Sequence, residues 1–470
     1  MLGLISLCFP AALIWTLWYA INSDKDDIHP ILNQLIPAGH CACETATVFE
    51  CSSCLAPQTC AANTSAHYVR PTIWEYQYGR DDRNEGLTDS QCTVAFPGLF
   101  EDVDRASKHW QGDGNFTSSD LDSIRLVYGM ARAMIHNGEL YVIESKSKGE
   151  DHRRKIMATL SAMHRSLAAS PDRRALPNVE FIFSVEDKAS DVVGRGLPIW
   201  VFARKAPEES LWLMPDFGFW AWDNIIGGKN NGIGPYDEVV DKALVVEDGL
   251  DFGQKQAKLV WRGKLSFAPK LRRALLYASR GEEWNDVKEL NWKIRANYMT
   301  LEDHCKYMFI AHVEGMFETS TFLCKWKLIV VGRSYSASLK YRQACRSVIV
   351  AHELQYIQHH HYLLVSSGPQ QNYVQVQRDF ADLPTKMDAL LADPTEAQRI
   401  ADNSVRTFRE RYLTPAAEAC YWRQLWHGYA KVSEPGELFT IVEGKRMKRG
   451  LRYETFVLLS SQEMLEFSAT

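Results

Sequence analysis

The stretch of sequence that decides the fold is DHCKYMFIAHVEG at residues 303–315, followed by SASLKYRQAC at 336–345 and SVIVAH at 347–352. The first segment carries an apolar run that ends on Gly315, which predicts a buried strand whose end lies at the ligand-binding edge of an α/β sheet. The second predicts a short helix with hydroxyl residues near its start, and the third predicts the next strand. Strand, glycine, helix and strand form a βαβ unit, and the exposed amides at such a helix start favour phosphate.

The segments on either side of this unit belong to the same predicted domain. They predict strands at 258–263 and 373–376 and helices at 269–280, 384–391, 394–412 and 416–432. The strand at 258–263 ends on Arg262-Gly263. We place this C-terminal domain at 236–432, with a polar tail at 433–470.

An N-terminal α/β domain is predicted at 101–235. Its expected elements are helices at 121–134 and 151–168 and strands at 139–144, 179–185 and 198–203. The strand at 179–185 is followed by Glu186-Asp187, and a carboxylate pair just beyond the carboxyl end of a buried strand is where an α/β protein places a general base. A solvated loop end is the other interpretation of this pair.

The composition is that of a globular protein with two domains. The chain has 470 residues, of which 46% are hydrophobic and 24% charged, and its net charge is −5. A chain of this length exceeds one ordinary core. The mild negative charge argues against general nucleic-acid binding, which usually requires a basic protein.

The N-terminal segment predicts a membrane anchor. Residues 1–21 contain no charged side chain, and about 20 apolar residues suffice to cross a bilayer. We interpret the segment as a signal-anchor transmembrane helix. A cleaved signal peptide is the alternative, since Pro10 interrupts the run and Ala20 lies near its end. Acidic residues follow the run, which favours a protein body on the lumenal side of the membrane.

Residues 22–100 form a Cys-rich stem in this interpretation. Five cysteines lie between Cys41 and Cys60, and Cys92 follows. Disulfides behind an export signal explain them better than half a zinc site, because no second ligand pair completes the spacing. Sequons at Asn63 and Asn115 agree with a secretory route.

A set of motifs gives the sequence a family resemblance. They are MPDFGFWAW at 214–222, VWRG at 260–263, DHCKY at 303–307, LKY at 339–341 with Cys345, HHH at 359–361, SSGP at 366–369 and ACYW at 419–422. Together they resemble glycosyltransferase family 90, which includes the capsule-associated xylosyltransferases and the Rumi-type protein O-glucosyltransferases. The chain is most similar to the family's fungal membrane-anchored branch, and the resemblance covers about Glu101 to Val432.

The resemblance implies a GT-B-like α/β fold, in which two Rossmann-like domains face each other across a cleft, with 101–235 on the acceptor side and 236–432 on the donor side. It implies transfer of xylose or glucose from a UDP-sugar, with inversion, to a polysaccharide, glycolipid or protein hydroxyl. Inversion requires a base for the acceptor proton and a cationic or amide-rich site for the departing UDP. No metal or other cofactor is expected. The implied location is the Golgi or ER membrane, as a single-pass type II protein with a lumenal catalytic domain.

The resemblance also assigns site residues. Asp187 takes the base position, with Glu186 as the competing carboxylate. Arg262 is the candidate for contact with the donor diphosphate, because guanidinium donors suit phosphate oxygens. The other expected donor contacts are Gly263, Gly315, Arg333, Ser336 and Lys340.

The same resemblance implies cysteine pairs and a role for the histidines. Cys305 is expected to pair with Cys345, and Cys420 with one of the cysteines between residues 41 and 60. His352 with 359–361 could bind a metal, but the family position of the triplet favours cleft lining or packing.

The sequence departs from the family in two places. Residues 316–332 separate Gly315 from a helix that follows within a few residues in the family, and removing them joins Gly315 to Arg333 at the family spacing. We interpret 316–332 as an unspliced intron translated into the chain, with a genuine lid or insertion as the alternative. A mature transcript that retains these codons would overturn the interpretation.

The second departure is chemical. The family helix carries an arginine immediately before Leu-Lys-Tyr, where it would contact the donor phosphates, and this chain has Ser338 there. Losing a charge-assisted contact to a leaving phosphate weakens transition-state stabilisation, although Arg333 or Lys340 could substitute. The second hypothesis is therefore a catalytically impaired lumenal protein of the same fold that binds sugar or nucleotide.

Overall fold

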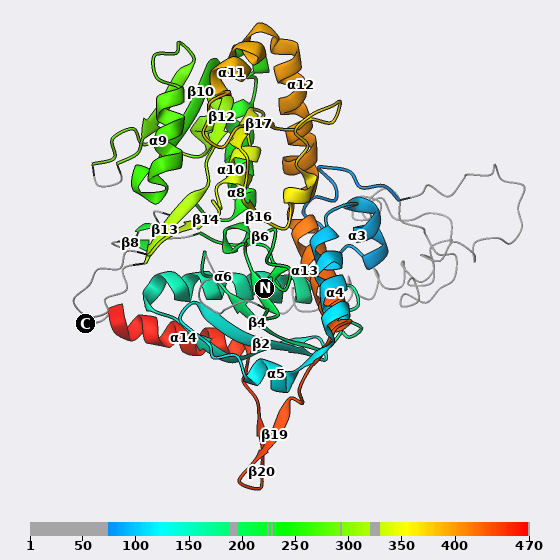
Figure 1. Cartoon of the computed structure of the whole chain (residues 1–470). Helices are drawn as coiled ribbons and strands as arrows, with labels where there is room; N and C mark the ends of the chain where they lie inside the picture. Colours follow the sequence, from blue (N-terminus) through cyan, green and yellow to red (C-terminus); the bar gives the residue numbers. More distant parts are fainter. Residues whose placement is uncertain are drawn as a thin grey trace, which may run out of the picture. The chain divides into compact units, whose positions relative to one another are not determined.

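The computed structural model describes residues 74–187, 196–222, 225–226, 229–230, 232–291, 294–319 and 330–468, and Glu75–Thr470 forms one compact unit (Figure 1). The predicted anchor at 1–21 and most of the predicted stem at 22–100 lie outside the described residues. Among the helices that the structure does describe, none is both long and apolar enough to cross a bilayer.

The stretch around Gly315 builds a five-stranded sheet in which every strand pairing is parallel. Its strands, in spatial order, are β11 (Asn285–Glu289), β10 (Gln256–Gly263), β12 (Tyr307–His312), β15 (Val348–His352) and β17 (Val374–Val376). All residues of the central strand β12 are buried. A strand covered on both faces is apolar throughout instead of alternating, which explains the unbroken apolar run at 308–313.

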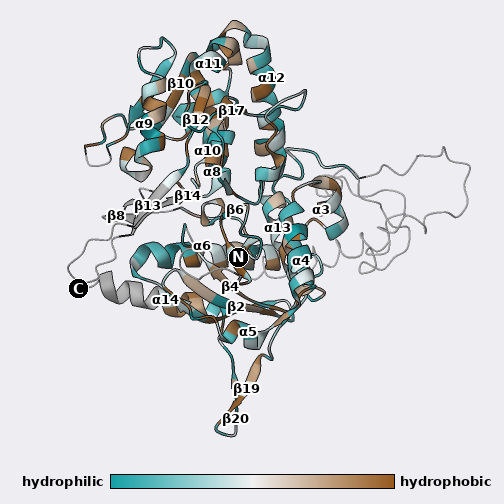
Figure 2. Cartoon of the chain, in the orientation of Figure 1, coloured by the Kyte–Doolittle hydropathy of each residue, from teal (hydrophilic) through white to brown (hydrophobic). Residues whose placement is uncertain are grey.

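Helices cover both faces of this sheet. They are α8 (Tyr236–Glu247), α9 (Pro269–Ala278), α10 (Leu339–Gln343), α11 (Leu383–Ala392) and α12 (Pro394–Ser404), which continues as the π-helical segment η7 (Val405–Tyr412). Phe309 packs in one apolar cluster with residues of α9, α11 and α12, whereas its neighbour Ile310 packs in another with residues of α8 and α10. Figure 2 shows hydrophobic residues concentrated on the strands of this sheet.

A six-stranded mixed sheet is built mainly from the N-terminal half of the unit. Its spatial order is β21 (Leu451–Arg452), β3 (Glu139–Lys146), β2 (Met130–His136), β4 (Val179–Ser184), β5 (Ile199–Val201) and β7 (Trp212–Leu213). The pairings from β21 to β4 are antiparallel, and those from β4 to β7 are parallel. Asn137 and Gly138 join β2 to β3 with positive φ angles of 52° and 73°, as a two-residue hairpin turn requires. The chain is therefore mixed α/β.

The predicted helix at 121–134 is wrong. Helix α5 (Ser118–Asp122) ends early, and the chain then forms β2. Residues 130–135 are all buried because β2 lies between β3 and β4 and is covered on both faces. Such a strand carries no alternation of apolar and polar residues, so its sequence was compatible with a helical spacing.

The last core helix returns to the N-terminal sheet. Helix α13 (Pro415–Ala430) packs against α4 (Glu101–Asp113), α6 (Gly149–Ala168) and β4. Its Tyr429 ring meets the ring of Trp200 edge-on at a centroid distance of 5.2 Å. The sheet therefore takes part of its cover from a helix more than two hundred residues away in sequence.

The remaining elements are short or peripheral. Beyond α13, β19 (Phe439–Val442) and β20 (Lys445–Lys448) form an exposed hairpin, and α14 (Tyr453–Ser468) follows β21. The two-stranded pairs are β1 (Phe116–Thr117) with β18 (Ser433–Glu434), β6 (Arg204–Lys205) with β16 (Tyr356–Ile357), β8 (Ile225–Ile226) with β9 (Lys229–Asn230), and β13 (Gly315–Thr319) with β14 (Val330–Ser334).

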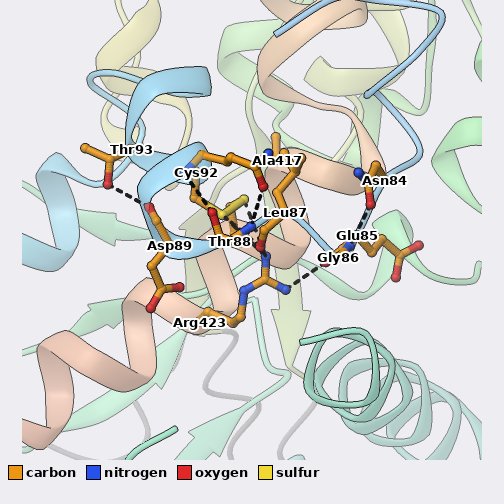
Figure 3. Close-up of a disulfide and its surroundings, with 12 residues drawn as sticks. Asn84, Glu85, Gly86, Leu87, Thr88, Asp89, Cys92, Thr93, Ala417 and Arg423 are labelled. Carbon is orange, nitrogen blue, oxygen red and sulfur yellow. Dashed lines mark hydrogen bonds between the residues drawn. A yellow bond between two sulfur atoms is a disulfide. The ribbon is translucent and has the colours of Figure 1, made fainter. Parts of the chain in front are cut away.

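Two disulfides join distant parts of this unit. The predicted Cys305–Cys345 bond is confirmed. Cys420 bonds to Cys92 and not to a cysteine between residues 41 and 60, so that prediction is wrong (Figure 3). The reason is local packing. Helix α3 (Asp89–Ala95) packs against α13, and Arg423 Nη2 on α13 donates to the Leu87 carbonyl at 2.8 Å. The Cα atoms of the two cysteines are 5.5 Å apart, which is within the usual disulfide range.

Candidate active site

The MPDFGFWAW motif, which follows β7 of the mixed sheet, contacts the LKY motif of α10 at a buried joint. Lys340 Nζ on α10 donates to both carboxylate oxygens of Asp216, at 2.7 Å and 2.8 Å, and both side chains are almost fully buried. The Tyr341 hydroxyl donates to the Gly218 carbonyl at 3.0 Å. A Cβ on Gly218 would lie only 2.5 Å from that hydroxyl, so a larger residue would separate the two motifs.

This joint changes the interpretation of Lys340. The ammonium group also donates to the Ala337 carbonyl at 2.9 Å, so its three donor positions are filled by protein. Burial lowers the pKa of Lys340, while Asp216 raises it. The structure thus places this predicted donor contact in a buried ion pair that joins the two sheets.

The predicted base lies directly after β4 on the first sheet. Glu186 Oε1 is 2.6 Å from His152 Nε2 on α6, and Asp187 Oδ1 is 4.0 Å from Lys155 Nζ, one helical turn further along. The Asp187 side chain is 32% exposed and that of Glu186 18%. Of the two carboxylates, Asp187 is therefore the more accessible to a substrate.

The surroundings of Asp187 favour a base. Burial raises the pKa of Asp187, and the nearby carboxylates of Asp151 and Asp216 raise it further, while Lys155 lowers it. Burial likewise raises the pKa of Glu186, against the lowering effect of His152. A raised carboxylate pKa brings the group closer to the working pH, which improves proton abstraction.

Tyr335 packs against Gly315, just beyond the end of β12 in the parallel sheet. Its hydroxyl is buried, and after desolvation the largest influences that raise its pKa are Asp216 and Asp187. Its carbonyl oxygen lies 2.9 Å from where a Cβ on Gly315 would stand, so only glycine permits this approach. The Tyr335 backbone therefore packs against Gly315, and since Ser336 follows Tyr335 directly, these two predicted donor residues lie together.

Arg262 lies at the carboxyl end of β10, as predicted, but is held by the neighbouring strand. Its Nη2 donates to Asp286 Oδ2 on β11 at 2.8 Å, and the Tyr307 hydroxyl donates to the same oxygen at 2.7 Å. A Cβ on Gly263 would lie 2.4 Å from the Trp261 ring. The structure therefore places Arg262 in an ion pair within the parallel sheet.

The suspected intron forms part of a two-stranded ribbon. Gly315 on β13 pairs with Ser334 on β14, and Met316 pairs with Arg333, so the two ends of the segment lie opposite each other. Residues 320–329 fall outside the described ranges. The ribbon accommodates the segment structurally, and its origin as an intron stays a prediction.

Sequence reasoning missed a second cationic group on α10. Arg342 Nη1 lies 2.5 Å from His312 Nδ1, at the carboxyl end of β12. Burial, together with the nearby charge of Arg272, lowers the pKa of Arg342 to about 9. The signal was present in the sequence as an arginine directly after the Leu-Lys-Tyr motif.

The histidine triplet packs close to the joint. His359 contacts Phe219 and Tyr421, with ring centroids 5.5 Å and 4.7 Å away. Burial lowers the pKa of His359 to about 3 and that of His361 to about 4, so both rings are neutral near pH 7. No three potential ligand side chains of the described residues form a metal cluster.

Comparison with known proteins agrees with the arrangement of these motifs. The chain matches the family model described as Glycosyl transferase family 90 over residues 90–436. It is similar to the O-glucosyltransferase rumi of Drosophila melanogaster, 24% identical over 327 residues that cover 65% of this chain and 73% of that protein. The O-glucosyltransferase rumi homolog of Anopheles gambiae is 25% identical over 257 residues, which cover 50% of this chain and 56% of that protein. These similarities support a glycosyltransferase, and because the family model spans most of its length, the chain belongs to glycosyltransferase family 90.

Proposed function

We propose that this protein is an inverting glycosyltransferase of GT-B architecture, which moves xylose or glucose from a UDP-sugar to a hydroxyl group of a polysaccharide, glycolipid or protein. The proposal rests on a chain of contacts that begins at Asp187, beyond the end of β4. Asp187 Oδ1 lies 4.0 Å from Lys155 Nζ, and that ammonium group lies 5.2 Å from the centroid of the Phe217 ring. Next to Phe217, Asp216 pairs with Lys340 on α10, shortly after Ser336. A carboxylate from the first sheet thereby approaches the phosphate-favouring edge of the parallel sheet. The similar proteins named O-glucosyltransferase favour glucose among the possible sugars.

In the proposed reaction Asp187 accepts the proton of the acceptor hydroxyl as its oxygen attacks the anomeric carbon. The bond from that carbon to the β-phosphate oxygen breaks, and UDP leaves with the negative charge. Positive charge and backbone amides near Gly315 and Ser336 would stabilise that charge. The proposal includes no metal ion or other cofactor.

The proposed location is the Golgi or ER membrane, with residues 1–21 as a single-pass anchor and the catalytic unit in the lumen. The disulfides Cys92–Cys420 and Cys305–Cys345 support an oxidising compartment.

A donor screen tests the proposal. The purified full chain is incubated with a panel of UDP-sugars, and released UDP and sugar transfer are measured with glycan and protein acceptors. Turnover with UDP-glucose or UDP-xylose, with inverted stereochemistry in the product, would support it. A retained anomeric configuration would overturn the single-base mechanism.

The second candidate function is binding of a sugar or nucleotide without transfer. It is favoured by Ser338, which replaces the family arginine, and by the enclosure of Lys340 against Asp216, which leaves Lys340 unable to substitute. UDP binding in calorimetry, combined with no turnover of any UDP-sugar, would establish this second function.

A further inference from the structure

Arg342 lies one helical turn after Ser338. Residues four apart lie on the same side of a helix, whereas residues two apart point away from each other. Arg342 therefore projects from the same side of α10 as Ser338, whereas Lys340 points to Asp216. The chain thus lacks the family arginine at 338 but carries another arginine on the same side of the helix.

His312 holds the Arg342 side chain at the carboxyl end of the parallel sheet. Burial holds the pKa of His312 well below its ordinary value, so the ring is neutral and its Nδ1 accepts a hydrogen bond from Arg342 Nη1 at 2.5 Å. His312 is the last residue of β12, three residues before Gly315. The guanidinium is therefore directed to the sheet edge where α/β folds bind their ligands.

The charged side chain that influences Arg342 is another arginine. Arg272 on α9 lies near enough to lower the pKa of Arg342, and its Nη2 is 4.0 Å from where a Cβ on Gly315 would stand. The carboxylate of Glu314 is instead engaged by Arg378 at 3.1 Å and by the backbone amides of Gln355 and Tyr356. No carboxylate of the described residues pairs with Arg342.

A guanidinium has five N–H donors, and His312 accepts only one of them. A half-buried positive charge is unfavourable unless an anion pairs with it. The planar arrangement of the arginine N–H donors matches the spacing of phosphate oxygens. The chemistry of this position therefore fits a diphosphate better than a neutral sugar.

We propose that Arg342, positioned by neutral His312, is the cationic contact for the diphosphate of a nucleoside diphosphate sugar, in place of the arginine that is absent at Ser338. The assignment rests on the proposed function. It explains how the donor site keeps a guanidinium although Lys340 is enclosed in the joint.

Calorimetric titration of the full chain with UDP and with uridine tests this assignment. Arg342→Gln is expected to weaken UDP binding by about 10- to 100-fold, because it removes charge-assisted hydrogen bonds. Uridine, which has no phosphate, should bind as it does to the wild type. Arg346→Gln is the matched control, since Arg346 lies four residues on and pairs with Asp402 in a partly exposed ion pair, and its UDP affinity should stay unchanged.

Two further variants distinguish loss of the phosphate contact from a folding defect. Arg342→Lys keeps the charge and should lose less affinity than Arg342→Gln. Ser338→Arg combined with Arg342→Leu moves the guanidinium back to the family position and should restore UDP affinity to within a few-fold of the wild type. Wild-type affinity in Arg342→Gln, or no recovery in the double variant, would overturn the assignment while the proposed function stands. A wild-type chain that binds no UDP would overturn both.

Discussion

The ammonium group of Lys340 lies between the two carboxylate oxygens of Asp216, a residue 124 positions earlier in the chain, at 2.7 Å and 2.8 Å. This pair and the Tyr341–Gly218 hydrogen bond join the parallel sheet to the mixed sheet. Each partner is buried, so each depends on the other for compensation of its charge.

Removing one member of this pair should destabilise the protein strongly. Lys340→Met is expected to lower the free energy of unfolding by about 3–5 kcal/mol, because it leaves Asp216 buried and unpaired. Combining it with Asp216→Leu should recover part of that loss. Lys306→Met serves as the control in the same denaturant titration: its pair with Asp303 is exposed, so the expected change is about 0–1 kcal/mol. Equal losses in both single variants would contradict this account of the joint.

Asp187→Asn should abolish most of the transferase activity while leaving the fold intact. The amide cannot accept the acceptor proton, so we expect kcat to fall by about 10²- to 10⁴-fold. Glu186→Gln, which removes the neighbour bound to His152, should reduce kcat much less. Initial rates and melting temperatures of both variants check this, and the opposite ranking would transfer the base role to Glu186.

Lys155 sets the pH at which the base works. Since Lys155 lowers the pKa of Asp187, Lys155→Met should raise that pKa. The base is active when deprotonated, so the acidic limb of the kcat/KM profile should move to higher pH. Lys155→Arg keeps the positive charge and should leave the profile near that of the wild type. An unchanged limb in Lys155→Met would mean that another group controls it.

Glu418 on α13 should make the stability depend on pH. Burial raises its pKa to about 8, well above the ordinary value. The folded state therefore holds a proton that the unfolded state releases between these two values, and stability falls as the pH rises through this window. Glu418→Gln should remove this fall and be more stable than the wild type near pH 8, by about 1–3 kcal/mol. Urea titrations on either side of the window test it, and parallel pH dependence in both proteins would refute it.

Deleting residues 316–332 should leave the fold unchanged. Gly315 and Ser334 are paired neighbours in the β13–β14 ribbon, so the shortened chain can close across the ribbon base. We expect a melting temperature within a few degrees of the full chain and retained UDP binding. Loss of the fold would show that the segment is an integral part of the structure.

The parallel sheet was predictable because its central strands are apolar up to their last residue and end on recognisable turns. The segments at 303–315 and 347–352 became β12 and β15, and the disulfide between Cys305 and Cys345 followed from the family resemblance. The same lack of alternation between apolar and polar residues led to the wrong helix prediction at 121–134, because β2 is covered on both faces. A pattern along the chain cannot distinguish a buried strand from a helix without its neighbours.

The site was less predictable, because its residues are defined by partners far away in sequence. Nothing near Lys340 indicates that Asp216 will enclose it, and nothing near Arg262 indicates the ion pair with Asp286. Asp187 could be located because it follows a strand directly. Arg342 was overlooked because its role depends on where His312 lies in the fold.

The Cys92–Cys420 bond spans 328 residues. During synthesis Cys92 leaves the ribosome long before Cys420 exists, and six other cysteines have already emerged ahead of it. For most of translation Cys92 therefore has only incorrect oxidation partners. Maturation of this protein consequently depends on keeping that thiol reduced, or on reshuffling early crosslinks, until the end of the chain arrives.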